Sequence, residues 1–152
     1  IQTMADTQWL AIEDLDSFEV HGAKLWVKLD FAIRHGDRVY IYDWKTGKVV
    51  KENEVQLAIY AIYAQKKWDM SLNLIRLFDV YLNQQIPVKV KPTEKLLSSA
   101  SQFIKDSISD MKKLLTDKEN NEADIDLFPM KIEDRESYPC SYCSFQTICY
   151  DQ

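Results

Sequence analysis

Residues 24–45 read KLWVKLDFAIRHGDRVYIYDWK, and this stretch decides the fold. Its apolar side chains recur with a period of two, which is typical of a strand with one buried face. Residues 35–37, His-Gly-Asp, interrupt the alternation with a turn signal before it resumes at residue 38. The sequence therefore predicts two antiparallel strands, over 20–33 and 38–45, joined by a tight hairpin loop.

The same patterns predict the elements on either side of the hairpin. Further strands are expected over Trp9–Glu13 with Phe18–Val20, over 74–82 and over 87–90, and a polar connector over 119–126. A helix over 54–68 is apolar on nearly every side, so we expect it to pack on the sheet. A second helix over 93–115 has Thr93 as its N-cap. Its apolar stripe comprises Leu96, Leu97, Ala100, Phe103, Ile104, Ile108, Met111 and Leu115. This order predicts an α+β domain with helices packed on a mostly antiparallel or mixed sheet.

The composition is that of a globular chain. The 152 residues are 46% hydrophobic and 28% charged, which argues against intrinsic disorder and against a disulfide-stapled miniprotein. A chain of this length fits one domain, 1–152, which buries roughly 70% of its unfolded surface. No apolar run approaches the roughly 20 residues that span a bilayer, and the first residues do not resemble a signal peptide. We therefore expect a cytoplasmic protein that does not enter a membrane.

The charge is distributed unevenly. The net charge is −5, which argues against nonspecific coating of nucleic acid. Residues 22–52 nevertheless hold seven bases against four acids, whereas residues 117–136 hold eight acids against three bases. A phosphate-facing side is allowed by this pattern, although a solvated surface is the ordinary interpretation of both stretches.

Asp30, Asp43 and Lys45 are the first candidate functional residues. Asp43 and Lys45 lie two apart on one strand and therefore share a face, and Asp30 lies on the neighbouring strand. Burying unpaired charge on a face that begins as core costs several kcal/mol. Two carboxylates that bind a hard divalent cation would relieve that cost, and a nearby lysine could act on water or phosphate. A salt bridge at a strand end is the ordinary alternative.

Gln56 and Tyr60 are the second candidates, because they lie four apart on one face of the expected helix. Each has an ordinary interpretation on its own: a polar residue near a helix start, and a half-buried tyrosine with a satisfied hydroxyl.

Taken together, residues 28–48 (KLDFAIRHGDRVYIYDWKTGK) and 56–60 (QLAIY) resemble the RecB-like nuclease domain of the PD-(D/E)XK superfamily. The marks are an acid closing one strand, a D-x-K-T-G-K turn closing the next, and Q-x-x-x-Y on the following helix. The resemblance implies a restriction-endonuclease-like α+β fold with a central mixed sheet flanked by helices. It also implies an Mg²⁺- or Mn²⁺-dependent DNA exonuclease of the DNA repair and recombination type, with DNA and a helicase or recombination protein as partners.

The resemblance implies a role for each of six positions: Asp30, Asp43 and the backbone carbonyl of Trp44 as metal ligands, Lys45 as the catalytic lysine, and Gln56 and Tyr60 as support for DNA or the active site. The alternative is a catalytically inactive nuclease fold that binds DNA or a partner protein.

One part of the family pattern is not found. The family's fold begins with a helix that supplies a further acid or histidine to the metal site, and the residues before Glu13 contain no such helix. Glu13 and His21 are weak stand-ins, as a strand and a loop residue. We therefore expect 1–152 to be a fragment that lacks its N-terminal helix.

Cys140, Cys143 and Cys149 lie in the C-terminal tail, 137–152. Close-set cysteines in a cytosolic chain favour a metal over a disulfide, and free thiols are the alternative. The tail resembles the P-x-x-C-x-x-C-x5-C ending of AddB-like nucleases, which implies a [4Fe–4S] cluster completed by an upstream cysteine. This chain has only three cysteines, so we expect an intact cluster in the full-length protein only.

Overall fold

The computed structural model describes residues 6–47, 53–128, 136 and 139–146. The chain divides into two compact units, Ile1–Ile108 and Ser109–Gln152, which are described separately. The single domain over 1–152 stays a prediction.

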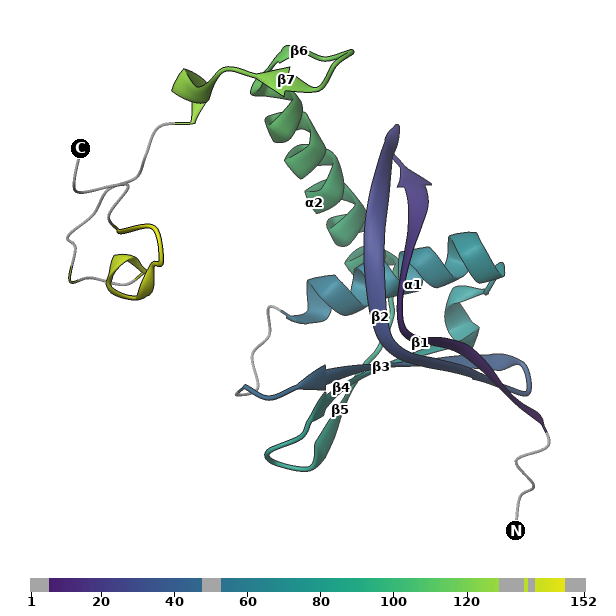
Figure 1. Ribbon diagram of the computed structural model, residues 1–152. Coiled ribbons are helices and arrows are strands. Elements are labelled where there is room, and N and C mark those ends of the chain that lie inside the picture. The colour runs from purple at the N-terminus through teal and green to yellow at the C-terminus, as the bar shows by residue number, and fades with distance from the viewer. Residues whose placement is uncertain (1–5, 48–52, 129–135, 137–138, 147–152) are drawn as a thin grey trace. The chain divides into compact units, whose positions relative to one another are not determined.

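The first unit is built on a five-stranded sheet (Figure 1). Its elements are β1 (Thr7–Val20), β2 (Ala23–His35), β3 (Arg38–Lys45), α1 (Asn53–Trp68), a 3₁₀ turn (Leu72–Leu74), β4 (Ile75–Tyr81), β5 (Ile86–Val90) and the first part of α2 (Glu94–Lys113). The spatial order is β1-β2-β3-β4-β5, and every neighbouring pair is antiparallel except β3 and β4, which are parallel. The prediction of a mixed α+β sheet is confirmed.

β1 and β2 form a long hairpin whose turn is His21–Gly22. Both turn residues have positive φ angles, +49° at His21 and +69° at Gly22, and glycine adopts such angles readily. Positive φ angles at both positions match the twist of the turn to that of the two strands. The predicted strand over 20–33 is therefore wrong at its start, because Val20 ends β1 and pairs with Ala23.

The predicted alternation along β2 is also only partly right. Val27 and Leu29 are buried as expected, but the next buried side chain is Ala32, so the pattern changes phase. A register shift between Trp9 and Ala11 on β1 accompanies this change. Such a bulge bends both strands, and Figure 1 shows β2 curving from the hairpin into the sheet.

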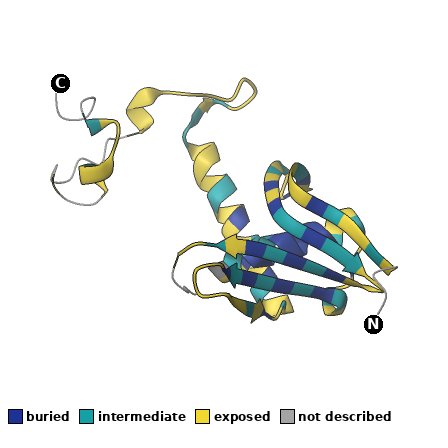
Figure 2. Cartoon of the chain, turned by 60° about the horizontal axis from the view of Figure 1, so that its bottom comes forward, coloured by how far each residue is buried: buried dark blue, intermediate teal, exposed yellow. Residues whose placement is uncertain are grey.

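α1 connects the parallel strands β3 and β4 and supplies much of the core. Ala58, Ala61 and Ala64 are fully buried, and their small side chains allow the helix to lie close to the sheet. Figure 2 shows buried and exposed residues alternating along the strands. The crossover matters for function, because parallel neighbours end at the same edge of a sheet.

α2 begins as predicted, with the Thr93 hydroxyl accepting a hydrogen bond from the Leu96 backbone N–H at 3.2 Å. Its stripe is buried at Leu97, Ala100 and Ile104. Phe103 and Met111 were expected in the same stripe but are 59% and 60% exposed. The apolar stripe is therefore wider than the surface that α2 packs against.

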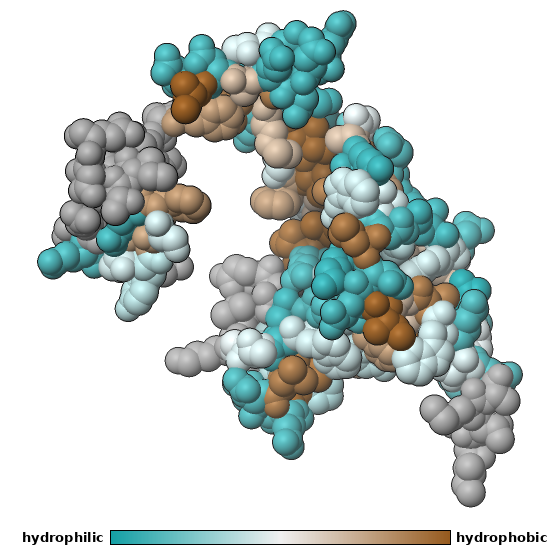
Figure 3. All heavy atoms as spheres, in the orientation of Figure 1, coloured by the Kyte–Doolittle hydropathy of each residue, from teal (hydrophilic) through white to brown (hydrophobic). Residues whose placement is uncertain are grey.

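The described part of the second unit contains short elements: β6 (Leu115–Asp117), β7 (Glu122–Ala123) and 3₁₀ turns at Ile125–Leu127 and Cys140–Tyr142. The expected polar connector 119–126 thus includes a strand and the start of a turn. Among the described residues, no helix is long and apolar enough to cross a membrane. In Figure 3, apolar patches interrupt a mainly hydrophilic surface.

Candidate active site

Asp43 and Lys45 lie together at the end of β3, on the face that Val39 and Ile41 bury. Asp43 is 2% exposed. Lys45 Nζ lies 2.5 Å from Asp43 Oδ2, and the lysine side chain is 20% exposed. This buried acid is therefore neutralised by a cation that still reaches the surface.

Gln56, in the first turns of α1, joins this pair. Its Oε1 accepts a hydrogen bond from Lys45 Nζ at 2.7 Å. Its Nε2 donates to Asp43 Oδ1 at 3.1 Å and to Tyr60 Oη at 2.7 Å. One amide thus fixes the positions of the acid, the lysine and the tyrosine at once, because each of its polar atoms has a charged or hydroxyl partner.

Tyr60 lies one helical turn after Gln56 and is 6% exposed. Its hydroxyl lies 3.1 Å from the Lys28 carbonyl oxygen and 3.3 Å from Asp43 Oδ1. A hydroxyl has one proton, so it donates to one of these acceptors at a time. Burial, followed by the nearby Asp43 and Asp30 charges, raises the pKa of Tyr60 well above its usual value, so the phenol stays neutral.

Asp30 lies on β2, at the edge of this cluster. The β2–β3 register pairs Phe31 with Tyr42. The next residues beyond this last pair are Asp30 on β2 and Asp43 on β3. Asp30 is half-buried, and its Oδ2 accepts a hydrogen bond from the Trp44 backbone N–H at 2.8 Å.

The Trp44 side chain points to the other face of the sheet. It is 41% exposed, and its ring stacks on Tyr42 with centroids 6.1 Å apart. Only the backbone of Trp44 therefore lies at the candidate site, and the role of its carbonyl as a metal ligand stays a prediction.

Asp79 is the site residue that the sequence analysis missed. It lies on β4, directly beside Asp43 in the parallel register, and is 3% exposed. Among the described residues, its Oδ1 has no hydrogen-bond partner. Burial raises the pKa of Asp79, the Lys45 charge opposes that rise, and the Asp43 and Glu54 charges add to it. Asp79 is therefore a third carboxylate under the influence of Lys45, but it does not form a common metal site with Asp30 and Asp43 among the described residues.

The donor atoms suit a hard divalent cation in kind, because Asp30, Asp43 and the Trp44 carbonyl all offer oxygen. A buried polar atom without a partner, such as Asp79 Oδ1, is also common beside an ion site. In number the set is small: within the described ranges, no three His, Cys, Asp or Glu side chains converge as a metal site. Mg²⁺ tolerates such a set, since it keeps several water ligands.

Neither weak stand-in joins the cluster. Glu13 is exposed, has a φ of +48°, and pairs with Lys28 at 3.5 Å. His21 lies in the hairpin turn, where its Nε2 is 2.9 Å from Ser101 Oγ on α2. Their contacts have an ordinary structural use, since the Glu13–Lys28 pair joins the two strands of the hairpin and His21 ties the hairpin to α2.

The cysteine tail is described in part. Cys140 and Cys143 are free thiols at the two ends of a 3₁₀ turn, half-buried and exposed respectively. Cys149 and Lys48 lie outside the described residues. Three thiolates remain one short of the four that a cluster needs.

Comparison with known proteins bears on the fold and the family. The family model of the PD-(D/E)XK nuclease superfamily matches residues 2–150. The chain also resembles the crystal structure of a protein from Eubacterium rectale that carries the provisional name of an exonuclease, with 13% identity and a TM-score of 0.50. The match covers 86% of this chain and 51% of that one, so the chain spans about half the length of that protein, and the likeness shows the fold alone. No curated protein matches the sequence. Since the family model covers nearly the whole chain, the protein belongs to the PD-(D/E)XK nuclease superfamily.

Proposed function

We propose that this protein is a metal-dependent DNA exonuclease that hydrolyses phosphodiester bonds, with Asp43, Lys45 and Asp30 at its catalytic centre. The observation that carries the proposal is the hydrogen-bonded group of Asp43, Lys45, Gln56 and Tyr60. Such a group costs folding free energy, because it desolvates an acid and a lysine. That cost is expected where a site serves chemistry.

Each residue has a distinct task in this proposal. Asp43 and Asp30, with the Trp44 carbonyl, hold a divalent Mg²⁺ or Mn²⁺ ion. When bound, the ion supplies positive charge to the phosphate oxygens and lowers the pKa of a water ligand.

Lys45 is the residue suited to act on the substrate. Its ammonium group reaches the surface, so it can contact a phosphate oxygen or the attacking water. It then stabilises the negative charge that grows in the transition state. Gln56 holds the ammonium beside Asp43, and Tyr60 supports Gln56 while keeping water away from that carboxylate.

The test compares the wild type with Asp43→Ala and Lys45→Ala on labelled linear and circular DNA, with Mg²⁺, Mn²⁺ or EDTA. The control is Asp37→Ala, which removes an exposed acid in the turn just before β3. We expect both site variants to lose about 100-fold or more of the cleavage rate, while the control keeps it. Products released one nucleotide at a time from linear DNA, with circular DNA intact, support an exonuclease. Equal cleavage by all four proteins contradicts the assigned site.

A second function is favoured by one observation. The described residues bring together only a small oxygen donor set, and Lys45 already pairs with Asp43. A catalytically inactive nuclease fold that binds DNA or a partner protein would keep this arrangement for stability. It predicts DNA binding that is equal in EDTA and in Mg²⁺, unchanged by Asp30→Asn, and without cleavage.

The finer assignments are also proposals. The D-x-K-T-G-K and Q-x-x-x-Y patterns support the RecB-like group and a role in DNA repair or recombination beside a helicase, in the cytoplasm. The spacing of Cys140, Cys143 and Cys149 supports an Fe–S role once a fourth ligand is available. Iron and acid-labile sulfide analysis of anaerobically purified protein tests that role independently of DNA cleavage.

A further inference from the structure

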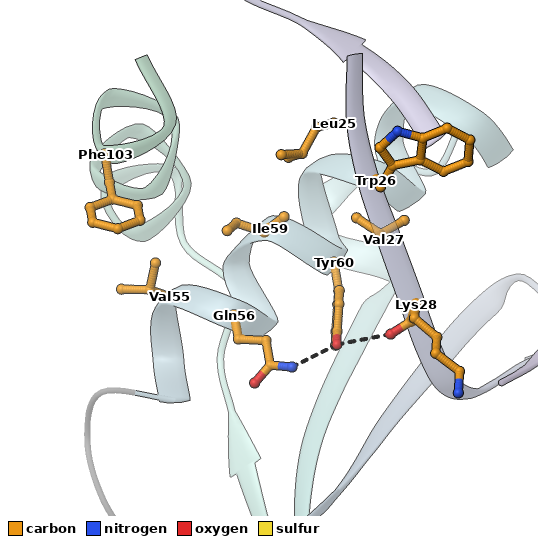
Figure 4. Close-up of a pocket in the computed structure, with 9 residues that line it drawn as sticks. All are labelled: Leu25, Trp26, Val27, Lys28, Val55, Gln56, Ile59, Tyr60 and Phe103. Atoms are coloured by element: carbon orange, nitrogen blue, oxygen red, sulfur yellow. Dashed lines mark hydrogen bonds between the residues drawn. The ribbon is translucent and has the colours of Figure 1, made fainter. Parts of the chain in front are cut away.

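An apolar pocket of about 610 Å³ opens beside the candidate active site. It lies between β2, the start of α1 and α2, all within the first unit (Figure 4). This volume is within the range of pockets that take small organic ligands.

The walls of the pocket come from three elements. Leu25 and Val27 line it from β2, Val55 and Ile59 from α1, and Phe103 from α2. Figure 4 shows the Phe103 ring directed toward Val55, whereas the Trp26 ring points to the other side of β2. Phe103 is 59% exposed, so a large aromatic face is available at the pocket mouth.

The pocket is continuous with the candidate active site. Gln56 and Tyr60 line it, and the same two side chains hold Asp43 and Lys45. The dashed lines in Figure 4 mark the hydrogen bonds that join Gln56, Tyr60 and the Lys28 carbonyl along its floor. A group in the pocket would therefore lie next to a phosphate at Lys45.

The charge around the pocket suits a polyanion. None of the described lining residues is acidic, and Lys28 is one of them. The nearest described acid is Asp43, which accepts a hydrogen bond from Gln56 at 3.1 Å and is paired with Lys45. Glu13 pairs with Lys28.

We propose that this pocket receives an unpaired nucleobase of the DNA strand whose phosphate lies at Lys45. A base offers flat apolar faces that stack on an aromatic ring such as Phe103, and an apolar cavity buries them. A base held in a duplex cannot enter, so the domain acts on single-stranded or frayed DNA. This inference rests on the proposed function, because it takes the substrate to be DNA.

The test measures binding of a labelled single-stranded oligonucleotide by fluorescence anisotropy in EDTA, where cleavage does not interfere. The same oligonucleotide with abasic residues and its duplex serve as competitors. Phe103→Ala is compared with Trp9→Ala, which removes an exposed aromatic ring on β1 that is not part of the pocket lining. Phe103→Tyr keeps the ring, and thermal unfolding checks that each variant folds.

We expect the wild type to prefer the intact single strand over the abasic strand by about five-fold or more, the effect of losing one stacked base. Phe103→Ala should abolish that preference, while Phe103→Tyr and Trp9→Ala retain it. The proposal is overturned if intact and abasic strands bind equally, or if both alanine variants lose the preference equally.

The outcomes separate this inference from the nuclease proposal. Base-dependent binding that needs Phe103, without any Asp43-dependent cleavage, keeps the pocket and removes the nuclease. Asp43-dependent cleavage that is indifferent to abasic residues and to Phe103→Ala keeps the nuclease and removes the pocket, which would then suit an apolar protein segment instead.

Discussion

Asp43 on β3 and Asp79 on β4 are parallel-register neighbours, and both carboxylates are almost completely buried. Two acids side by side in a low-dielectric environment cannot both ionise cheaply. Lys45 relieves part of the repulsion, since its charge acts on both groups. Asp43 has the direct ion pair with Lys45. The free-energy cost of burying a second charge therefore falls mainly on Asp79, as its raised pKa indicates.

Asp79→Asn should therefore stabilise the fold at neutral pH. Asn keeps the shape and removes a buried charge that has no hydrogen-bond partner at Oδ1, which is worth about 1 kcal/mol in the free energy of unfolding. The pKa of Asp79 is raised in the folded state, so the wild type is relieved of this cost at low pH and bears it as the pH rises.

Urea unfolding of the wild type and Asp79→Asn at about pH 4 and about pH 8 measures this effect. The gain should appear at the higher pH and shrink at the lower one. Asp37→Asn, an exposed acid, should show no gain at either pH. A loss of stability at the higher pH would mean that Asp79 is paired and ionised in the folded protein.

Lys45→Met should destabilise the protein and also abolish cleavage. Removing the ammonium leaves Asp43 buried without its ion pair, at a cost of about 2 kcal/mol, because Lys45 is partly exposed. Adding Asp43→Asn should restore stability by removing the charge that was left unpaired, and cleavage should stay lost. If the double variant is as unstable as the sum of the single ones, the two side chains do not interact.

Tyr60→Phe tests the role of the hydroxyl that supports Gln56. The change removes one hydrogen-bond acceptor for Gln56 Nε2, and we expect a loss of about 1 kcal/mol in stability. Since Gln56 also holds Lys45, the cleavage rate should fall as well, with little change in DNA affinity. Tyr40→Phe, on the opposite face of the sheet, is the matched control, and an equal effect there would exclude a specific role.

Local patterns predicted most of the fold, because period-two and helical apolar spacings report which side chains are buried. The β3 strand, both helices and the Thr93 cap have the predicted character. The bulge between Trp9 and Ala11 was not predictable in this way, since a bulge depends on how two distant strands pair. Phe103 was assigned to the core for a similar reason. The apolar stripe of a helix does not show which of its residues pack against another element.

The site was predicted as far as its residues lie near one another in sequence. Asp43, Lys45, Gln56 and Tyr60 come within one strand and the next helix, and the structure brings them together. Asp79 reaches them only through the β3–α1–β4 crossover. A signal for it existed, because Asp79 shares the alternating buried face of β4 with Ile75, Leu77 and Tyr81.

Asp16 joins the β1–β2 hairpin to α1, and its contacts predict a pH dependence of stability. Its Oδ2 accepts a hydrogen bond from the Tyr63 hydroxyl at 2.7 Å and lies 3.0 Å from Lys67 Nζ. The Tyr63 hydroxyl, the Ser17 backbone N–H and Lys67 together lower the pKa of Asp16 from 3.8 to about 2. A lowered pKa in the folded state means that ionised Asp16 adds stability above its unfolded pKa, and that this stability is lost as the pH falls toward about 2.

Asp16→Asn should therefore be less stable than the wild type at neutral pH, and the free energies of unfolding of the two proteins should converge in acid. Tyr63→Phe should reproduce part of the loss, and the double variant should lose less than the sum because both changes remove the same contact. Two stability curves that stay parallel from about pH 7 to about pH 2 would show that Asp16 has the same pKa in the folded and unfolded chains.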